Sequence, residues 1–512
     1  MPQETILILD FGGQYTQLIA RRVRQLQVYS QVLLCTATME QIRECTPKGI
    51  IFSGGPSSVL DPDAPRCPSE VFEMGIPILG ICYGMQLMGH MLGGRVAPAE
   101  KREYGLVQVR MNHLCPILKD TEANNACWMS HTYQVVELPD GFATTAGTET
   151  CPIAAMADEK RKFYGVQFHP EVTHTRNGMS IIQHFLMDIC GCTGDWEMGS
   201  YAQRQIQALK KAIGKDTVLL GLSGGVDSAV AAALLSKAIG DQLTCVFVDH
   251  GFLRKGEFEQ VREVFTNTFP TRLVAVDAKA HFMEKLRGVS DPETKRKIIG
   301  REFVEIFREE SGKLGKLDHF AQGTIYPDVI ESGGAQGSHV IKSHHNVGGL
   351  PAELGFTTLI EPLRMLFKDE VRQLGLALGL PEDLVWRQPF PGPGLAIRVM
   401  GDLTEEKVRI VRESDAILRE EIANAGLDRE ISQYFTVLTG VRSVGVMGDE
   451  RTYDYAVAIR AVTTDDFMTA DWYRIPYDTL SLISRRIVNE VKQVNRVLLD
   501  VTTKPPASVE WE

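Results

Sequence analysis

The sequence predicts two parallel-sheet α/β domains in tandem, followed by a smaller α+β C-terminal domain. In the first part of the chain, helical patterns such as 15–27 alternate with strand-like apolar runs at 5–10, 28–34, 49–53 and 77–82. A second alternating series follows, with strand-like runs at 217–222, 243–249, 272–277 and 319–324. Such alternation is typical of a parallel sheet. Beyond residue 387 the pattern changes to long helices mixed with strands at 435–439 and 455–462, which indicates an α+β domain.

We expect domain limits at 1–195, 200–387 and 388–512. The loose stretch CGCTGDWEMGS at 190–200 is the best linker candidate. Nine of the ten cysteines lie before residue 193, which indicates that the first segment is a unit of its own. Residues 331–351 hold five glycines and no regular period, and so long a loop in a compact domain is usually a functional lid or disordered.

Composition excludes several classes of protein. The 512 residues are 44% apolar and 23% charged, which is ordinary for a soluble globular protein. The net charge of −11, without any basic run, predicts no nucleic-acid partner. No apolar stretch approaches the length of a membrane span, and the N-terminus has no signal-peptide pattern. Ten cysteines in so long a chain are not a disulfide framework, so we expect the reducing cytoplasm.

A first candidate site centres on Cys82, within GICYG at 80–84. Small residues between a buried strand and a helix permit the sharp turn of a nucleophile elbow. A helix N-terminus also favours the thiolate form of a cysteine. Backbone N–H groups near Gly55, in FSGGPSS, could join that of Tyr83 as oxyanion donors. The alternative is a buried structural cysteine.

The segment YGVQFHPEVTHT at 164–175 supplies partners for Cys82. If it is extended, side chains two residues apart share a face, so Glu171 can hold the imidazole of His169. A base held by a carboxylate and serving a distant cysteine is a nucleophile–base–orienter arrangement. Two alternatives remain open. His169 could be a buried histidine whose ring nitrogens are hydrogen-bonded within the core. Alternatively, H-x-E could belong to a zinc deaminase, although the P-C-x-x-C of that signature is missing.

Together, GICYG, SGGPSS and FHPE resemble the class I glutamine amidotransferase domain. The resemblance implies that Cys82 attacks the carboxamide of glutamine, forms a glutamyl thioester and releases ammonia. His169 and Glu171 would complete its catalytic triad. The chain departs from the family at one position, where Tyr133 replaces an aspartate that usually follows a Ser-His pair.

A second candidate site is the stretch GLSGGVDSAV at 221–230, between a buried strand and an Ala/Leu-rich helix. Glycines and serines at a helix N-terminus are suited to binding an anion. The Walker pattern requires a lysine, but this loop carries Asp227 instead. The plain alternative is helix capping, because Ser and Asp are favoured in a first turn.

The sequence SGGVDS resembles the loop of the N-type ATP pyrophosphatases, which cleave ATP between its α- and β-phosphates. The resemblance implies that the loop grips the departing pyrophosphate and that Asp227 helps to hold Mg²⁺, a cation that prefers oxygen ligands. The ATP-binding residues would be Ser223, Gly224, Gly225, Val226, Asp227, Ser228 and Ala229. Further along the chain, Lys368 in LFKDE would supply a positive charge for the phosphates. The alternative is a charged side chain on the solvent-exposed face of a helix.

The resemblance extends from residue 5 to residue 512. Segments such as KRKIIGREF, KSHHNVGGLP, PFPGPGLAIRVMG and the terminal KPPASVEWE are similar to those of the glutamine-hydrolysing GMP synthases. In that family ATP adenylylates XMP, and ammonia then displaces AMP to give GMP. The implied substrates are glutamine, ATP and XMP, and no tightly bound organic cofactor is implied. His344 and His345 would belong to a mobile lid, with solvated histidines as the alternative, and the family suggests a homodimer through the C-terminal domain.

The C-terminal KPPASVEWE is the candidate XMP site. A strand-like run at 496–501 leads into it, and two prolines stiffen its backbone. By resemblance, Lys504 would face the XMP phosphate, while Val509 and Glu510 would contact the ribose or base. Arg296 would add a second phosphate contact. The alternative is a loose tail, because chain ends are commonly frayed.

Other functions remain possible at this stage. One is another amidating ligase of the pyrophosphatase type, such as an NAD synthetase. A second is a non-catalytic purine or glutamine sensor that kept the fold, although the intact Cys82, His169, Glu171 and Asp227 argue against it. A tRNA-thiolating enzyme shares the phosphate loop, but the acidic net charge opposes it.

Overall fold

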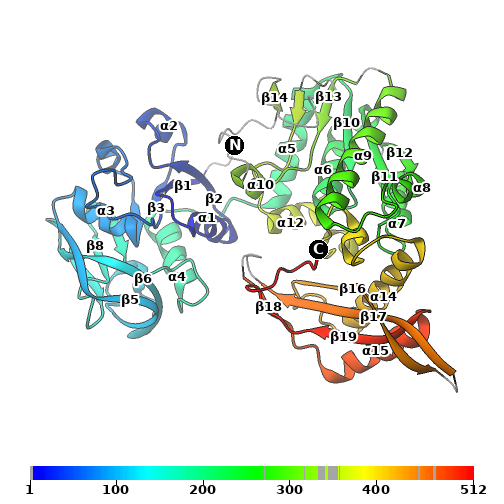
Figure 1. The fold of residues 1–512 in the computed structure, drawn as a ribbon. Coiled ribbons are helices and arrows are strands. Elements are labelled where there is room, and N and C mark those ends of the chain that lie inside the picture. Colours follow the sequence, from blue (N-terminus) through cyan, green and yellow to red (C-terminus); the bar gives the residue numbers. More distant parts are fainter. Residues whose placement is uncertain are drawn as a thin grey trace. The chain divides into compact units, whose positions relative to one another are not determined.

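The chain folds into two units, Met1–Tyr201 and Ala202–Glu512 (Figure 1). The computed structural model describes residues 4–269, 271–315, 317–331, 341–343, 356, 358–447, 450–464 and 469–512. Within these ranges, no helix combines the length and the apolar character needed to cross a membrane.

The first unit is built on a nine-stranded sheet with the order β2-β1-β3-β4-β9-β8-β7-β5-β6. The strands from β2 to β9 in this order are parallel and the others are antiparallel. Their bounds are β1 Thr5–Asp10, β2 Tyr29–Leu34, β3 Gly49–Phe52, β4 Ile78–Ile81, β5 Arg95–Met111, β6 Asn124–Glu137, β7 Ala143–Gly147, β8 Ala155–Asp158 and β9 Phe163–Val166. Strands β3, β4 and β9 are buried throughout, as their continuous apolar runs require in a covered parallel sheet.

Short helices cover the sheet of the first unit. They are α1 Thr16–Gln25, α2 Met39–Glu44, α3 Tyr83–Met91 and α4 Gly178–His184, with short helical turns at Ser69–Glu73, Pro116–Leu118 and Phe185–Ile189. Helix α3 follows β4 directly and packs its buried face into the core beside Leu9 and Phe52.

The second unit contains a six-stranded sheet with the order β12-β11-β10-β13-β15-β14, parallel except for β14. The strands are β10 Val218–Leu222, β11 Leu243–Asp249, β12 Arg272–Asp277, β13 His319–Ala321, β14 Ile341–Ser343 and β15 Thr358–Ile360. The accompanying helices are α5 Met198–Ile213, α6 Val226–Ile239, α7 Glu257–Asn267, α8 Lys279–Lys285, α9 Pro292–Lys313, α10 Tyr326–Glu331, α12 Lys368–Leu378 and α13 Glu382–Val385, with a turn at Gly240–Gln242.

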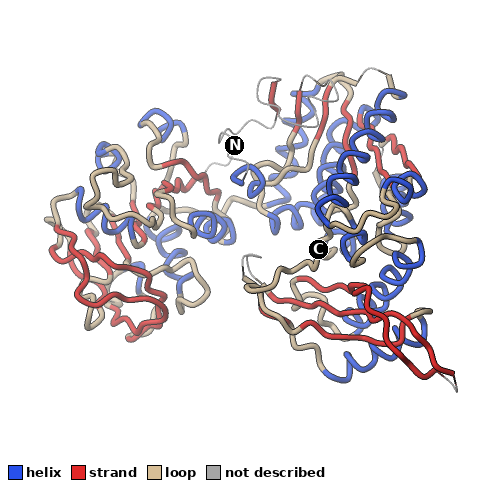
Figure 2. Tube along the Cα trace, in the orientation of Figure 1, coloured by secondary structure: helices blue, strands red, loops and turns tan. Residues whose placement is uncertain are grey.

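A four-stranded sheet forms the C-terminal part of this unit. Strands β16 (Gln433–Met447) and β17 (Glu450–Thr463) form a long antiparallel pair, while β18 (Asp471–Trp472) and β19 (Val494–Asp500) both pair with β17. Helices α14 (Glu405–Asn424) and α15 (Tyr477–Glu490) pack against these strands (Figure 2). A helical turn at Gly394–Arg398 precedes α14.

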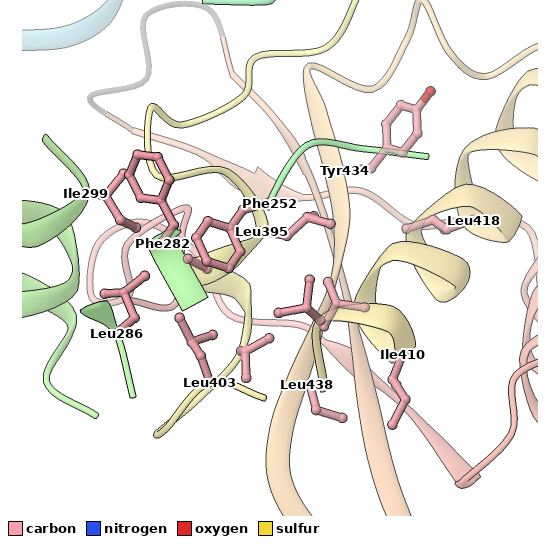
Figure 3. Packing of buried hydrophobic residues seen from close by; sticks show 14 of the residues in the cluster. Phe252, Phe282, Leu286, Ile299, Leu395, Leu403, Ile410, Leu418, Tyr434 and Leu438 are labelled. Carbon is pink, nitrogen blue, oxygen red and sulfur yellow. The ribbon is translucent and has the colours of Figure 1, made fainter. Parts of the chain in front are cut away.

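One apolar core joins the two sheets of the second unit. Phe282, Leu286 and Ile299 lie towards one side of this cluster in Figure 3, and Ile410 and Leu418 lie towards the other. Leu395, fully buried, lies between them. The segment that carries the phosphate loop and the C-terminal sheet are therefore packed through shared side chains.

The predicted fold class is confirmed, with differences in individual elements. Strands β1, β11 and β12 have the expected bounds. Strands β16 and β17 are longer than predicted because their outer halves carry polar and glycine residues that interrupt the apolar pattern. The long β5–β6 ribbon was not predicted, since charged side chains fill much of its exposed face.

The expectation of an extended segment at 164–175 is wrong beyond Val166. Strand β9 ends there and the chain turns at Pro170, which has no N–H to donate to a neighbouring strand. Of the expected lid at 331–351, only Glu331 and β14 are described, and β14 is a short strand where no regular structure was predicted. His344 and His345 lie outside the described residues.

Candidate active sites

Cys82 lies in a strained turn between β4 and α3. Its φ of 51° and ψ of −105° are unusual for a residue with a side chain. The flanking glycines are needed for space: a Cβ on Gly80 would lie 2.6 Å from the carbonyl oxygen of Gly84. A Cβ on Gly84 would lie 2.5 Å from the carbonyl oxygen of Phe52. The backbone thus has the geometry of the nucleophile elbow that the sequence predicts.

His169 and Glu171 meet beside this cysteine. Nδ1 of His169 lies 2.7 Å from Oε1 of Glu171, and both side chains are buried. Burial by itself would lower the pKa of His169, but the Glu171 carboxylate and a hydrogen bond with Cys82 outweigh it and hold that pKa well above its usual range. A Cβ placed on Gly54 would approach Cε1 of His169 at 3.3 Å and Cβ of Cys82 at 3.9 Å, so both side chains border this glycine.

Contacts outside the triad fix the histidine and its carboxylate. The hydroxyl of Thr175 donates to the carbonyl of His169 at 2.6 Å and accepts from the N–H of Trp128 at 3.0 Å. Nε of Arg22 donates to the carbonyl of Glu171 at 2.9 Å. The ring of Tyr15 packs edge-on against the His169 imidazole, with 5.2 Å between ring centroids. The turn therefore holds His169 and Glu171 together although the segment is not extended.

A cavity of about 480 Å³ opens at the triad and is lined by Cys82, His169, Gly55, Tyr83 and Tyr133, among others. Among the residues that the structure describes, the N–H groups of Gly55 and Tyr83 donate to no acceptor. They are available to a developing oxyanion. None of the described residues that line this cavity is acidic.

A buried cluster of Glu103, His131 and Cys151 supports the wall of this cavity. Their ligand-type atoms lie within 4.8 Å of one another. Glu103 accepts from the hydroxyl of Thr148 at 2.7 Å and contacts Nε2 of His131 at 3.2 Å, while Nδ1 of His131 lies 3.1 Å from the carbonyl of Tyr133. Burial raises the pKa of the Cys151 thiol to about 12, which keeps it protonated. The polar side chains of this cluster find their hydrogen-bond partners within the protein. They hold β6, which carries His131, beside the pocket.

Two buried glutamines near the sulfur were not predicted. Nε2 of Gln167 lies 3.5 Å from Sγ of Cys82, and Nε2 of Gln86 donates to Oε1 of Gln167 at 3.1 Å. Gln167 falls inside YGVQFHPEVTHT and Gln86 lies two residues after GICYG, but an uncharged amide carries no signal of its own in a sequence. Only the folded geometry places them at the nucleophile.

The phosphate loop joins β10 to α6 as expected. Ser223 and Ser228 bond each other through their hydroxyls at 3.1 Å, and Ser228 also donates to the carbonyl of Gly225 at 3.0 Å. The N–H groups of Gly224, Val226 and Asp227 have no acceptor among the described residues. A helix start with open N–H groups is suited to an anion. Gly225, the residue at the N-cap, has no side chain to cap the helix, and Asp227 lies in the first turn.

Asp227 is paired with Lys368. Nζ of Lys368, the first residue of α12, lies 2.6 and 2.7 Å from the two carboxylate oxygens of Asp227. Both side chains face a cavity of about 540 Å³ that the loop residues 222–227 also line. Arg296, Arg372 and Arg387 line it too, so most of the charged side chains in its walls are cationic. Ser228 and Ala229 are buried behind the loop and are not part of this lining.

Arg296 reaches this cavity from α9. The helix begins at Pro292, where the Asp291 side chain accepts from the N–H of Thr294 at 2.7 Å. Nη2 of Arg296 donates to the backbone carbonyl of Glu512 at 2.6 Å. Glu512 thus lies against an arginine that lines the cavity beside the phosphate loop.

The C-terminal segment is held in place rather than loose. Val509 is buried in a small core with Phe435 and Val437. Glu510 accepts from Nη2 of Arg398 and from Nε2 of Gln433, each at 2.9 Å. The backbone of Lys504 exchanges hydrogen bonds of 2.8 and 2.9 Å with Ala470. Lys504, Val509 and Glu510 do not line the cavity that contains Arg296.

Three family models match three successive segments of the chain. The model of the class I glutamine amidotransferases matches residues 7–189, that of NAD synthase matches 201–293, and that of the GMP synthase C-terminal domain matches 420–511. One solved structure, that of a putative GMP synthase subunit from Thermoplasma acidophilum, is 28% identical with a TM-score of 0.34; the match covers 40% of this chain and 98% of that one.

Full-length relatives are more similar. A glutamine-hydrolysing GMP synthase from Acetivibrio thermocellus is 62% identical, and one from Ruminiclostridium cellulolyticum is 60% identical. Each alignment covers all 512 residues of this chain and the whole of the relative. The chain therefore belongs to the glutamine-hydrolysing GMP synthase family.

Proposed function

We propose that the chain makes GMP: it hydrolyses glutamine to ammonia, adenylylates XMP with ATP, and lets ammonia displace AMP. The observation that carries this proposal is the presence, in one chain, of a cysteine triad and an acidic phosphate loop. The first produces ammonia and the second activates an oxygen that ammonia can displace. The full-length relationship to the GMP synthases supports glutamine as the substrate of the first site, and ATP and XMP as the substrates of the second.

In the glutaminase half, the sulfur of Cys82 attacks the carboxamide carbon of glutamine and forms a thioester. His169 takes the thiol proton and delivers it to the departing ammonia, while Glu171 stabilises the charged imidazole. Water then cleaves the thioester to glutamate and regenerates the thiol. The N–H groups of Gly55 and Tyr83 stabilise the oxyanion, and one such donor is typically worth about 10²–10³ in rate.

In the synthetase half, the loop from Ser223 to Ala229 binds ATP. The C2 oxygen of XMP attacks the α-phosphorus, and pyrophosphate leaves towards the open N–H groups at the start of α6. Lys368 moves from Asp227 to the phosphates. The donor set fits Mg²⁺, since Asp227 presents a hard carboxylate to the cavity. Mg²⁺ held there by Asp227 would neutralise the charge of the pyrophosphate.

XMP binds beside this cavity, between Arg296 and the C-terminal segment. Arg296 and Lys504 bind its phosphate, and Val509 and Glu510 contact the ribose or base. The buried Arg398 holds the Glu510 carboxylate at a defined position, which supports this assignment.

The proposal includes a cytoplasmic homodimer that binds no nucleic acid. Exposed apolar side chains on β16 and β17, at Val441, Val444, Val446 and Tyr453, offer a surface for a second copy of the C-terminal sheet. All ten cysteines are free thiols, in keeping with a reducing compartment. The net charge of −11 opposes nucleic-acid binding.

Product analysis tests the proposal. The full chain is incubated with XMP, ATP, Mg²⁺ and glutamine, and the nucleotides and phosphates are separated. We expect GMP, AMP, pyrophosphate and glutamate in equal amounts. Formation of ADP and phosphate, or GMP without AMP, would contradict the assignment of the loop. Omission of XMP is the matched control, in which AMP should not accumulate.

A further inference from the structure

Gln167 is a fully buried amide at the nucleophilic sulfur. Its Nε2 lies 3.5 Å from Sγ of Cys82, within range for a hydrogen bond to sulfur, and its side chain has no exposed surface. Its backbone N–H donates to the carbonyl of Ala154 at 2.8 Å, just after the end of β9. This hydrogen bond fixes the backbone of Gln167 against the start of β8, and so fixes the position from which its side chain extends.

The orientation of this amide follows from its neighbours. Nε2 of Gln86 lies 2.8 Å from the backbone carbonyl of Tyr133, which can only accept, so this atom of Gln86 is a nitrogen. Its second hydrogen points to Gln167 at 3.1 Å, and the atom of Gln167 on that side must be the oxygen. The NH₂ group of Gln167 is thus turned towards Cys82.

Besides His169, two groups contact the sulfur, and they favour opposite states of it. The carbonyl of Ser130 lies 3.6 Å from Sγ and accepts the S–H of the neutral thiol. Once the proton has moved to His169, this carbonyl has nothing to accept. The N–H of Gln167 interacts most strongly with the thiolate, because hydrogen bonds to charged groups are stronger than neutral ones.

We propose that Gln167 is a catalytic residue, which stabilises the Cys82 thiolate by donating a hydrogen bond to Sγ, with Gln86 as the positioning residue that fixes its amide. The thiolate occurs twice in the proposed glutaminase reaction. It exists before attack on the carboxamide and again when the C–S bond of the thioester breaks and the electron pair returns to sulfur. The inference deepens the proposed function and rests on it for the identity of the substrate.

Alkylation of Cys82 by iodoacetamide, followed by peptide mass spectrometry, measures the reactive form of the sulfur without any turnover. The rate is measured against pH for the full chain and for Gln167→Met, which keeps the size of the side chain but cannot donate. We expect the midpoint of the profile to move up by about one to two pH units, and the rate at neutral pH to fall about 10- to 100-fold. Gln86→Met should move it in the same direction by less.

Gln134→Met is the matched control, since Gln134 is buried in the same sheet but does not line the pocket. It should leave the alkylation midpoint unchanged. Hydrogen exchange on peptides of the first unit, which contains Gln167, verifies that the variant is folded. An unchanged midpoint in a folded Gln167→Met protein would overturn the inference. Because alkylation needs neither glutamine nor XMP, failure of the proposed function would appear separately, as a lack of product in the unmodified enzyme.

Discussion

Acidification should destabilise the second unit through one buried histidine, His250. This residue lies directly after β11 and is only 6% exposed. Its Nδ1 accepts the N–H of Phe252 at 3.0 Å, so the proton of the neutral ring is on Nε2. Burial, opposed by the charge of Asp249 and helped by that of Arg412, lowers the pKa of His250 from 6.5 to about 4.

The sign and size of the effect follow from that pKa. The unfolded chain binds a proton on this residue below pH 6.5, whereas the folded chain does so only near pH 4. Stability is therefore unaffected above about pH 7 and falls as the pH drops from 6.5 towards 4. The loss between pH 7 and pH 5 is about 2 kcal/mol.

His250→Asn is the comparison variant, because the asparagine oxygen can accept the same backbone N–H but does not titrate. Hydrogen exchange in urea, followed by mass spectrometry on peptides covering β11, gives the unfolding free energy of this unit at both pH values. The native chain should lose about 2 kcal/mol more than the variant on acidification. Equal losses in the two proteins would refute the reasoning.

Three substitutions test individual residues. Lys504→Ala keeps the backbone hydrogen bonds to Ala470 and should weaken XMP binding about 10- to 150-fold, as measured by titration. The affinity for ATP should be unchanged. Equal XMP affinities in the variant and the native chain would show that Lys504 does not bind XMP. Asp227→Asn should abolish AMP formation and leave glutaminase activity intact, and normal AMP release would contradict its role. Tyr133→Asp adds a carboxylate to a pocket whose described lining has none, so the KM for glutamine should fall about tenfold. The rate of GMP formation from ammonium should stay the same. An unchanged KM would mean that the amine of glutamine binds away from residue 133.

Local motifs predicted much of the two sites. The glycines around Cys82 indicated a strained elbow, and His169 and Glu171 do meet in space. The reason given for that meeting was wrong, since a turn rather than a strand joins them. The conclusion survived because two residues separated by one other can meet in either conformation.

Contacts between distant segments could not be predicted. Arg398 and Glu510 form an ion pair across 112 positions, and only the packing of the C-terminal sheet brings them together. The pairing of Lys368 with Asp227 likewise depends on how α12 packs near the phosphate loop. Gln167 carries no charge and no distinctive spacing, so its place at the sulfur became visible only in the fold.

The most direct test of the account follows the nitrogen atom. Glutamine labelled with ¹⁵N in its amide is supplied with XMP, ATP and Mg²⁺, and the GMP formed is examined by mass spectrometry. We expect labelled GMP from the native chain. Cys82→Ala should give no labelled GMP but undiminished synthesis from added ammonium. Labelled GMP from Cys82→Ala, or loss of both activities in a folded Cys82→Ala protein, would contradict the claim that this cysteine supplies the nitrogen consumed at the phosphate loop.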